Sequence, residues 1–165
     1  MDNPLARGAV TADWLAALRA YLLASASLDL LWEVAQLPLY EIGQTGTMAQ
    51  KAFAVAHCTM GDVLIALASL AAGLVIVGER AWPGRGFGRV AALAIAIGLA
   101  YTVFSEYRNV EVLQSWAYSA LMPQLPLLGT GLSPILQWIV VPMAAFAWAR
   151  RRSTLPVRKT GQCGT

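Results

Sequence analysis

Residues 53–77 read FAVAHCTMGDVLIALASLAAGLVIV, and this stretch decides the fold class. Asp62 is its one formally charged side chain, and aliphatic and small residues make up most of the rest. A helix needs roughly 20 mostly apolar residues to cross the hydrocarbon layer of a bilayer. The stretch is longer than that, so residues 53–77 are predicted to form a transmembrane helix.

Three more segments have the length and the apolar composition of a membrane span. They run from about residue 18 to 37, from 88 to 107 and from 131 to 149. Over the whole chain 58% of residues are hydrophobic and 13% are charged, whereas soluble globular domains have about 25% charged residues. The alternating pattern of a membrane barrel is not found. The prediction is therefore an all-α polytopic membrane protein, a four-transmembrane-helix bundle that forms one domain over residues 1–165, with a flexible basic tail at 150–165.

Arginine and lysine are divided unevenly between the two sides of this predicted bundle. The two terminal segments and the connection between the second and third spans are rich in them, whereas the opposite side has Lys51 and Arg108. Basic segments of short length stay on the cytoplasmic side of a membrane. We therefore expect a multi-pass protein of the bacterial inner membrane with both termini in the cytoplasm. Because the basic residues follow topology and no reading module is present, nucleic acid is not expected as a partner.

The acidic residues of the spans are the first candidates for function. An ionised side chain at the centre of a membrane helix costs about 2.5–3.5 kcal/mol on insertion scales, so it needs a partner, a proton or water. Residues three or four apart share one face of a helix. By this spacing each predicted span carries a polar stripe: Ser25, Asp29, Glu33 and Gln36 on the first, Cys58 and Asp62 on the second, Thr102, Ser105, Glu106 and Asn109 on the third, Ser133 and Gln137 on the fourth.

The depth of the stripes predicts where they meet. The first and third spans run outward, so Glu33 and Glu106 lie near their outer ends, and the second span begins there with His57. This indicates a polar cavity in the outer half of the bundle, open to the periplasm and roofed by the outer loops. We predict Glu33, Glu106 and Asp62 as catalytic residues in this cavity. Candidate ligand-binding residues are Asp29, Asn109, Trp116 and Tyr118.

A metal ion is one interpretation of the same residues. His57 is the single histidine of the chain, and with Glu33, Asp62 and Glu106 it would supply one nitrogen and several oxygen ligands. Such a set suits the divalent ions of zinc, iron or manganese better than copper(I). The structural interpretation is that the carboxyl groups hydrogen-bond to neighbouring helices, as polar groups of membrane bundles do. Trp116 and Tyr118 would then be anchors at the membrane interface.

Several short motifs resemble those of small four-span integral membrane proteins of bacteria to which no activity is assigned. The motifs are Trp32-Glu33, His57-Cys58-Thr59 with Gly61-Asp62, Ser105-Glu106 with Asn109, and Trp116-Ala117-Tyr118. The resemblance covers roughly residues 32–142. It implies the fold and the membrane location and carries over no activity.

Three classes of function are open at this point. The first is a membrane enzyme that acts on a lipid-like substrate, with a carboxylic acid as proton donor or a bound metal as Lewis acid. The second is a non-catalytic membrane subunit or scaffold whose polar residues hold the bundle together. The third is a small carrier of protons, metal or solute, which would act as an oligomer because four spans without a repeat do not form a complete alternating-access carrier. The expected partners are the lipid bilayer and either a second copy of the chain or a larger membrane complex.

Overall fold

The computed structural model describes residues 4–126 and 129–153 of the chain. In these ranges the structure is helical apart from the connections and two isolated β-bridges. The elements in chain order are α1 (Pro4–Gln36), the 3-10 helix η1 (Leu37–Leu39), α2 (Glu41–Thr45), α3 (Met48–Val77), α4 (Phe87–Glu106), the π-helix η2 (Tyr107–Val112) and α5 (Leu132–Ser153).

Four helical segments are long and apolar enough to cross a membrane, which confirms the predicted fold class. They are Trp14–Leu39, Met48–Val77, Phe87–Val112 and Leu132–Arg152. The third is longer than predicted, because η2 continues α4 beyond residue 107. The fourth is also longer, and its last turn contains three arginines that were expected to begin the tail. The rest of the expected tail, residues 154–165, lies outside the described residues.

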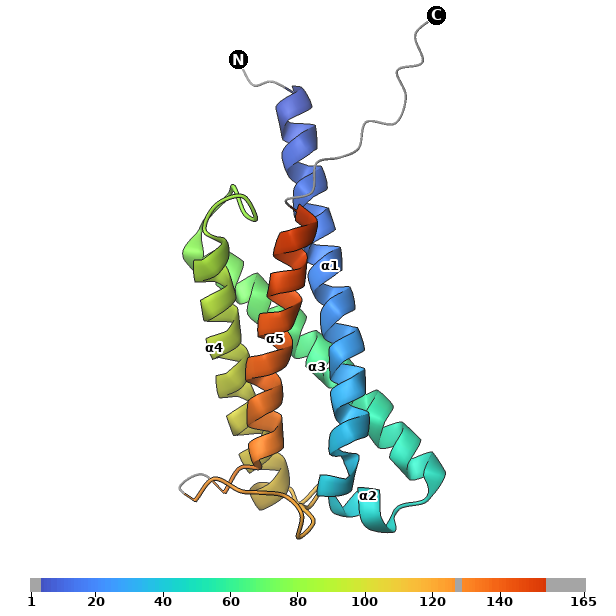
Figure 1. The fold of residues 1–165 in the computed structure, drawn as a ribbon. Helices are drawn as coiled ribbons and strands as arrows, with labels where there is room; N and C mark the ends of the chain where they lie inside the picture. The colour runs from blue at the N-terminus through green and yellow to red at the C-terminus, as the bar shows by residue number, and fades with distance from the viewer. Residues whose placement is uncertain (1–3, 127–128, 154–165) are drawn as a thin grey trace, which may run out of the picture.

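The four long helices pack as one bundle (Figure 1). α1 lies beside α5, α3 crosses them obliquely and packs on α1, and α4 packs on both α3 and α5. α1 begins and α5 ends at the same end of the bundle, which we call the terminal end (Figure 1). The opposite end, the loop end, carries η1, α2, η2 and the connection between η2 and α5, described over residues 113–126 and 129–131.

Local sequence sets several of the helix boundaries. α3 begins with a capping box, in which the Thr47 side chain accepts from the Gln50 backbone N–H and the Gln50 side chain accepts from the Thr47 backbone N–H. α3 ends at Gly78 with a φ of 64°, a conformation that glycine adopts far more easily than other residues. The chain then reverses and enters α4 at the terminal end.

Backbone hydrogen bonds fold the long connection over the loop end. Glu41 N–H donates to Ala117 O and Ser119 N–H donates to Leu39 O, each at 2.9 Å. The Ser119 hydroxyl also donates to Pro38 O at 3.0 Å. The segment after α1 therefore holds the connection in place, although the two are far apart in sequence.

The terminal half of the bundle contains an apolar core built on aromatic rings. Tyr21 of α1 and Phe146 of α5 stack with ring centroids 4.3 Å apart. Phe87, at the start of α4, meets Phe146 edge to face at 5.8 Å and lies parallel to Trp82 at 6.0 Å. In the loop half the buried residues on α1 are polar instead. The hydrophobic core therefore fills one half of the bundle and leaves the other half for polar groups.

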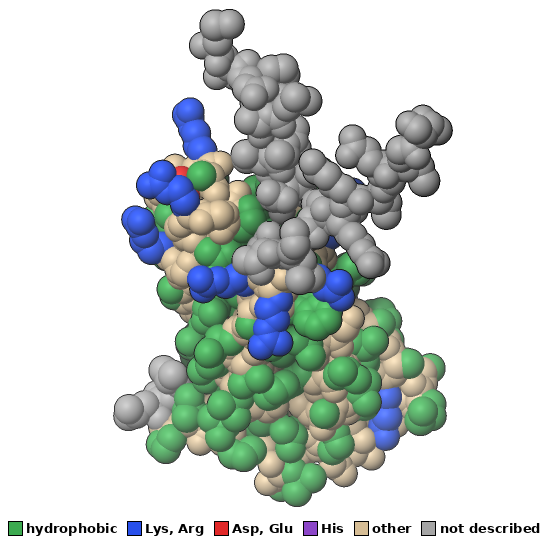
Figure 2. Space-filling model, turned by 45° about the horizontal axis from the view of Figure 1, so that its top comes forward, with side chains coloured by type: hydrophobic (Ala, Val, Ile, Leu, Met, Phe, Trp, Pro, Cys, Tyr) green, Lys and Arg blue, Asp and Glu red, His purple; other side chains and the backbone are tan. Residues whose placement is uncertain are grey.

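The charged surface is divided in the same direction. Figure 2 shows Lys and Arg side chains gathered around the terminal end, next to a surface that is largely hydrophobic. Arg80 and Arg85 lie in the connection between α3 and α4 at that end, and Arg150, Arg151 and Arg152 lie in the last turn of α5. This distribution matches a protein whose long apolar flanks face lipid tails and whose basic end lies at the level of the headgroups.

Candidate functional site

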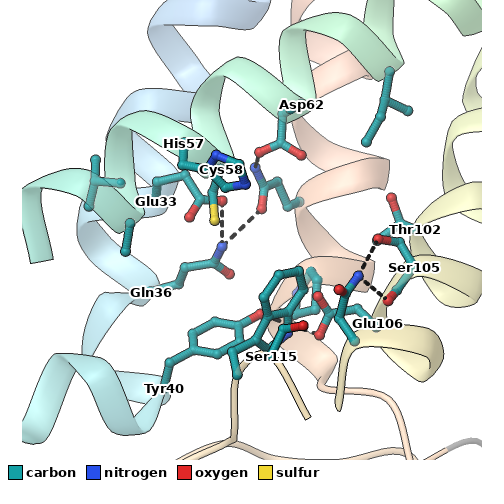
Figure 3. Close-up of a pocket in the computed structure, with 18 of the residues that line it drawn as sticks. Glu33, Gln36, Tyr40, His57, Cys58, Asp62, Thr102, Ser105, Glu106 and Ser115 are labelled. Carbon is teal, nitrogen blue, oxygen red and sulfur yellow. Dashed lines mark hydrogen bonds between the residues drawn. The ribbon is translucent and has the colours of Figure 1, made fainter. Parts of the chain in front are cut away.

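A cavity of about 600 Å³ lies in the loop half of the bundle (Figure 3). α3 and α4 form opposite sides of it, and the end of α1 and the start of α5 complete its wall. Its size is within the range of about 300–1,000 Å³ that is usual for small-molecule sites. The polar residues that line it are Glu33, Gln36, Tyr40, His57, Cys58, Asp62, Thr102, Ser105, Glu106, Asn109, Ser115, Trp116 and Gln137.

One side of the cavity is formed by an amide–carboxyl cluster, which consists of Asp29, Glu33, Gln36, Asp62 and Gln137. The Gln137 amide donates to Asp29 Oδ1 at 3.1 Å and to Asp62 Oδ2 at 2.9 Å. The Gln36 amide donates to Glu33 Oε1 at 2.7 Å and to Gln137 Oε1 at 3.2 Å. Because these residues belong to α1, α3 and α5, the cluster joins three helices.

The carboxyl groups of this cluster are buried among neutral partners. Asp29 is 4% exposed and Glu33 is 8% exposed. Glu33 of α1 and Asp62 of α3 lie close to each other in this cluster, and each accepts a bond from a glutamine amide. Two carboxyl groups close together in a low dielectric tend to share one proton. The cluster is therefore suited to hold a proton inside the bundle.

A second pair of hydrogen bonds extends the cluster to the start of α5. The Ser133 hydroxyl donates to Gln36 Oε1 at 2.8 Å and accepts from the Trp32 indole N–H at 3.1 Å. These contacts link the two ends of α1 and α5 that meet at the loop end.

The other side of the cavity is formed by a tyrosine–glutamate cluster, which consists of Tyr40, Glu106 and Tyr118. Glu106 is the last residue of α4 and is 8% exposed. The Tyr40 hydroxyl donates to Glu106 Oε2 at 3.4 Å, and the Tyr118 hydroxyl donates to the same oxygen. Tyr118 in turn accepts from the Gly131 backbone N–H at 2.9 Å. The folded connection therefore delivers one phenol to Glu106, and the segment after α1 delivers the other.

The two phenols remain donors at neutral pH. Burial raises the pKa of Tyr40 and that of Tyr118 above the usual value, and the carboxyl group of Glu106 raises both further. The ordinary pKa of tyrosine is about 10. Both hydroxyl groups therefore keep their protons and keep their bonds to Glu106 under physiological conditions.

Three more polar groups of this side line the cavity near Glu106. The Asn109 amide donates to Ser105 O at 2.8 Å and to Ser105 Oγ at 3.2 Å, one turn back along the helix. Within the described part of the chain, the buried Thr102 hydroxyl and the buried Trp116 indole nitrogen have no hydrogen-bond partner of normal geometry. The Trp116 indole lies close to the Glu106 carboxyl group. Among the described residues that line the cavity, both of these unpaired groups therefore lie on the Glu106 side.

His57 does not join the carboxyl groups as the metal interpretation expected. Its side chain is exposed and its ring stacks on Phe53 with centroids 5.5 Å apart, at the edge of the cavity. Among residues 4–126 and 129–153, no three His, Cys, Asp or Glu side chains are placed to hold a metal ion together. The predicted set of His57, Glu33, Asp62 and Glu106 is therefore not supported as a metal centre. Amides and phenols bond to the carboxyl groups instead, whereas His57 lines the cavity and stacks on Phe53.

The structure places the other predicted residues in two groups. Glu33, Asp62, Glu106, Asn109 and Trp116 line the cavity. Two others lie behind the lining: Asp29 behind Gln137, and Tyr118 behind Glu106.

Two residues of the site were not singled out from the sequence. Gln137 was placed on a stripe four residues after Ser133 but was given no role, although it joins three helices. Tyr40 belongs to the run Pro38-Leu39-Tyr40 and had no signal that would connect it with Glu106, which lies 66 residues later.

Comparisons of the chain with protein-family models, with curated proteins and with solved structures find no match. The resemblance to small bacterial membrane proteins therefore stays a prediction, and what is shown is an all-α bundle with four helices long and apolar enough to cross a membrane.

Proposed function

We propose that this chain is a multi-pass membrane enzyme that moves a proton to or from a lipid-like substrate held in the cavity. The supporting observation is that two separate carboxyl clusters lie on opposite sides of one cavity (Figure 3). A pair of carboxyl groups on opposite sides of a substrate can act as general acid and general base. The position of the cavity within the span region favours a substrate that dissolves in the bilayer.

Glu106 is the proposed group that exchanges a proton with the substrate. Both phenols bond to its Oε2 atom, which holds the carboxyl group in place and leaves Oε1 for another partner. A positioned carboxyl group within hydrogen-bond reach of the substrate is the requirement for general acid–base catalysis.

Glu33 is the proposed partner on the opposite side. It lies close to Asp62, and in this proposal the two carboxyl groups share one proton. The Gln36 amide orients Glu33 with a bond of 2.7 Å. In this arrangement a proton leaves the substrate toward one cluster while the other cluster supplies one.

The test is hydrogen exchange into lipids. The protein in nanodiscs is incubated in D₂O with a bacterial lipid extract, and mass spectrometry follows any lipid whose mass changes with time. We expect Glu106→Gln to lower the rate by roughly 10²- to 10⁴-fold, the usual contribution of a general acid or base. The matched control is Glu41→Gln, the same change at an exposed side chain of α2, which should leave the rate unchanged. A lipid change that proceeds equally in Glu106→Gln, or no lipid change at all with the unmodified protein, would contradict the proposal.

The amide–carboxyl cluster favours a second candidate, a non-catalytic subunit. Gln137 bridges Asp29, Asp62 and Gln36, and bonds of this kind between helices stabilise membrane bundles. Under that alternative Glu106→Gln would lower the stability of the bundle and no lipid would be converted. Unfolding of the same variant in detergent therefore separates the two candidates.

We also infer that the terminal end faces the cytoplasm of a bacterial inner membrane. The basic residues gathered at that end support this orientation, because short basic segments stay on the cytoplasmic side. The cavity would then lie in the periplasmic half of the membrane.

A further inference from the structure

The cavity has a side that faces the hydrocarbon layer, between α3 and α4. Phe53 and Leu64 of α3 and Tyr101 of α4 line the cavity and are exposed on the bundle surface. All three lie inside membrane spans, where an exposed side chain meets lipid. Gly61, on the α3 wall, would have nothing within 4 Å of an added Cβ atom. A molecule dissolved in the bilayer therefore has an open route to the polar groups.

The charge of the lining selects against anions. Glu33, Asp62 and Glu106 contribute carboxyl groups, and none of the described residues that line the cavity is Lys or Arg. A phosphate or carboxylate headgroup would enter a site of low dielectric with no cation to pair with, which is strongly unfavourable. The ligand is therefore neutral or cationic at its polar end.

The unpaired hydrogen-bonding groups of the lining distinguish a neutral polar end from a cationic one. Thr102 is 6% exposed and its hydroxyl has no partner among the described residues, and the Trp116 indole N–H likewise has none of normal geometry. The indole N–H only donates, whereas the Thr102 hydroxyl donates or accepts. Glu106 Oε1 is an acceptor on the same side of the cavity. A hydroxyl group donates once and accepts twice, so it can donate to Glu106 and accept from Thr102 and the Trp116 indole, whereas an ammonium group only donates and leaves the indole N–H unpaired.

We propose that the cavity takes the hydroxyl end of a neutral lipid alcohol, with the hydroxyl beside Glu106 and Thr102 and the alkyl part leaving between α3 and α4. That this alcohol is the substrate rests on the proposed enzyme function. That the cavity binds such an alcohol follows from the lining of the cavity alone.

The test compares three ligands that share one alkyl chain: the long-chain alcohol, the corresponding amine and the corresponding carboxylic acid. Each is titrated into the full-length protein in phosphatidylcholine nanodiscs, and native mass spectrometry measures the bound fraction. Because each unmatched hydrogen bond or unpaired charge in the site weakens binding, the alcohol should bind at least about tenfold more tightly than either analogue.

Two pairs of variants locate the hydroxyl and the chain. Thr102→Val should weaken binding of the alcohol by roughly three- to tenfold, which corresponds to one hydrogen bond, and Thr102→Ser should retain it. Thr59→Val is the matched control, because the Thr59 hydroxyl is also buried without a partner but does not line the cavity. Gly61→Leu should block binding, whereas Gly88→Leu should not, since Gly88 also has open space but lies outside the cavity lining.

Several results would overturn the proposed ligand, the proposed enzyme function or both. Tighter binding of the amine would make the cavity a site for cations, and equal binding of the acid would refute the charge argument. Equal losses in Thr102→Val and Thr59→Val would show that Thr102 does not contact the hydroxyl. Binding of the alcohol without conversion of any lipid would retain this ligand and refute the proposed enzyme function. Conversion of a lipid that lacks a hydroxyl group would refute the proposed ligand and leave the proposed enzyme function standing.

Discussion

Replacing Gln137 with leucine is predicted to destabilise the bundle. Gln137 is 2% exposed and makes hydrogen bonds of 2.9, 3.1 and 3.2 Å to Asp62, Asp29 and Gln36. Leucine is close to glutamine in size, so a cavity makes a small contribution. Side-chain bonds between membrane helices average about 0.6 kcal/mol, so three bonds account for about 2 kcal/mol. Asp29, left buried without this partner, adds about 1–3 kcal/mol, and the total loss of unfolding free energy is about 3–5 kcal/mol.

The assay is equilibrium unfolding in mixed micelles with increasing SDS, followed by tryptophan fluorescence and circular dichroism. Gln124→Leu is the matched control, because the Gln124 side chain is exposed in the connection over the loop end. It should unfold at the same SDS concentration as the unmodified protein.

A double variant tests the reasoning more sharply. In Asp29→Val/Gln137→Leu both partners of one buried bond are replaced by apolar groups, and such a replacement is nearly neutral compared with leaving one polar partner unpaired. The double variant should therefore be more stable than Gln137→Leu by about 1–3 kcal/mol. If it is equally or less stable, burial of an unpaired Asp29 is not the cause of the loss, and the account of the amide–carboxyl cluster is wrong.

Three further predictions concern packing, pH and topology. Gly98→Ala should lower the unfolding free energy by about 1–3 kcal/mol by overpacking, because a Cβ atom there would lie 2.2 Å from the Trp138 ring; a normal SDS midpoint would refute the close approach of α4 to α5. In the unfolded chain tyrosines ionise near pH 10, whereas the raised pKa values of Tyr40 and Tyr118 keep both protonated to higher pH in the folded chain. Their contribution to the unfolding free energy is therefore constant below about pH 10 and falls above it. The Tyr40→Phe/Tyr118→Phe variant should therefore lose less stability than the unmodified protein between about pH 9 and about pH 11, and an equal loss would count against the raised pKa values. If the C-terminus is cytoplasmic, a green fluorescent protein fused to it should fluoresce, and alkaline phosphatase fused at the same position should be inactive. The opposite pair of results would show that the proposed orientation is wrong.

The buried face of α1 followed from spacing alone. Ser25, Asp29, Glu33 and Gln36 were predicted to share one face of the first span, and all of them are buried in the structure. Glu106, on the stripe of the third span, is buried as well. The α-helix has 3.6 residues per turn, so side chains three and four apart lie on one face whatever surrounds the helix.

Helix spacing did not predict the surroundings of His57. His57 precedes Cys58, and one residue along an α-helix is a rotation of about 100°. That rotation leaves the His57 side chain exposed, and it stacks on Phe53 at the cavity. Sharing a cavity with Glu33 and Asp62 does not place His57 in a group of three metal-ligating side chains among the described residues.

The sequence by itself determined the class of the protein, its four spans and the polar face of its first helix. The physical reason is that crossing about 30 Å of hydrocarbon requires apolar runs of countable length, and that helix geometry is local. Only the tertiary structure decided which carboxyl groups share a cavity and which partners hold them. The oblique course of α3 and the fold of the connection, described over residues 113–126 and 129–131 (Figure 1), bring Asp62 to Gln137 and Tyr118 to Glu106. Those contacts depend on packing between segments far apart in the chain, which no local spacing encodes.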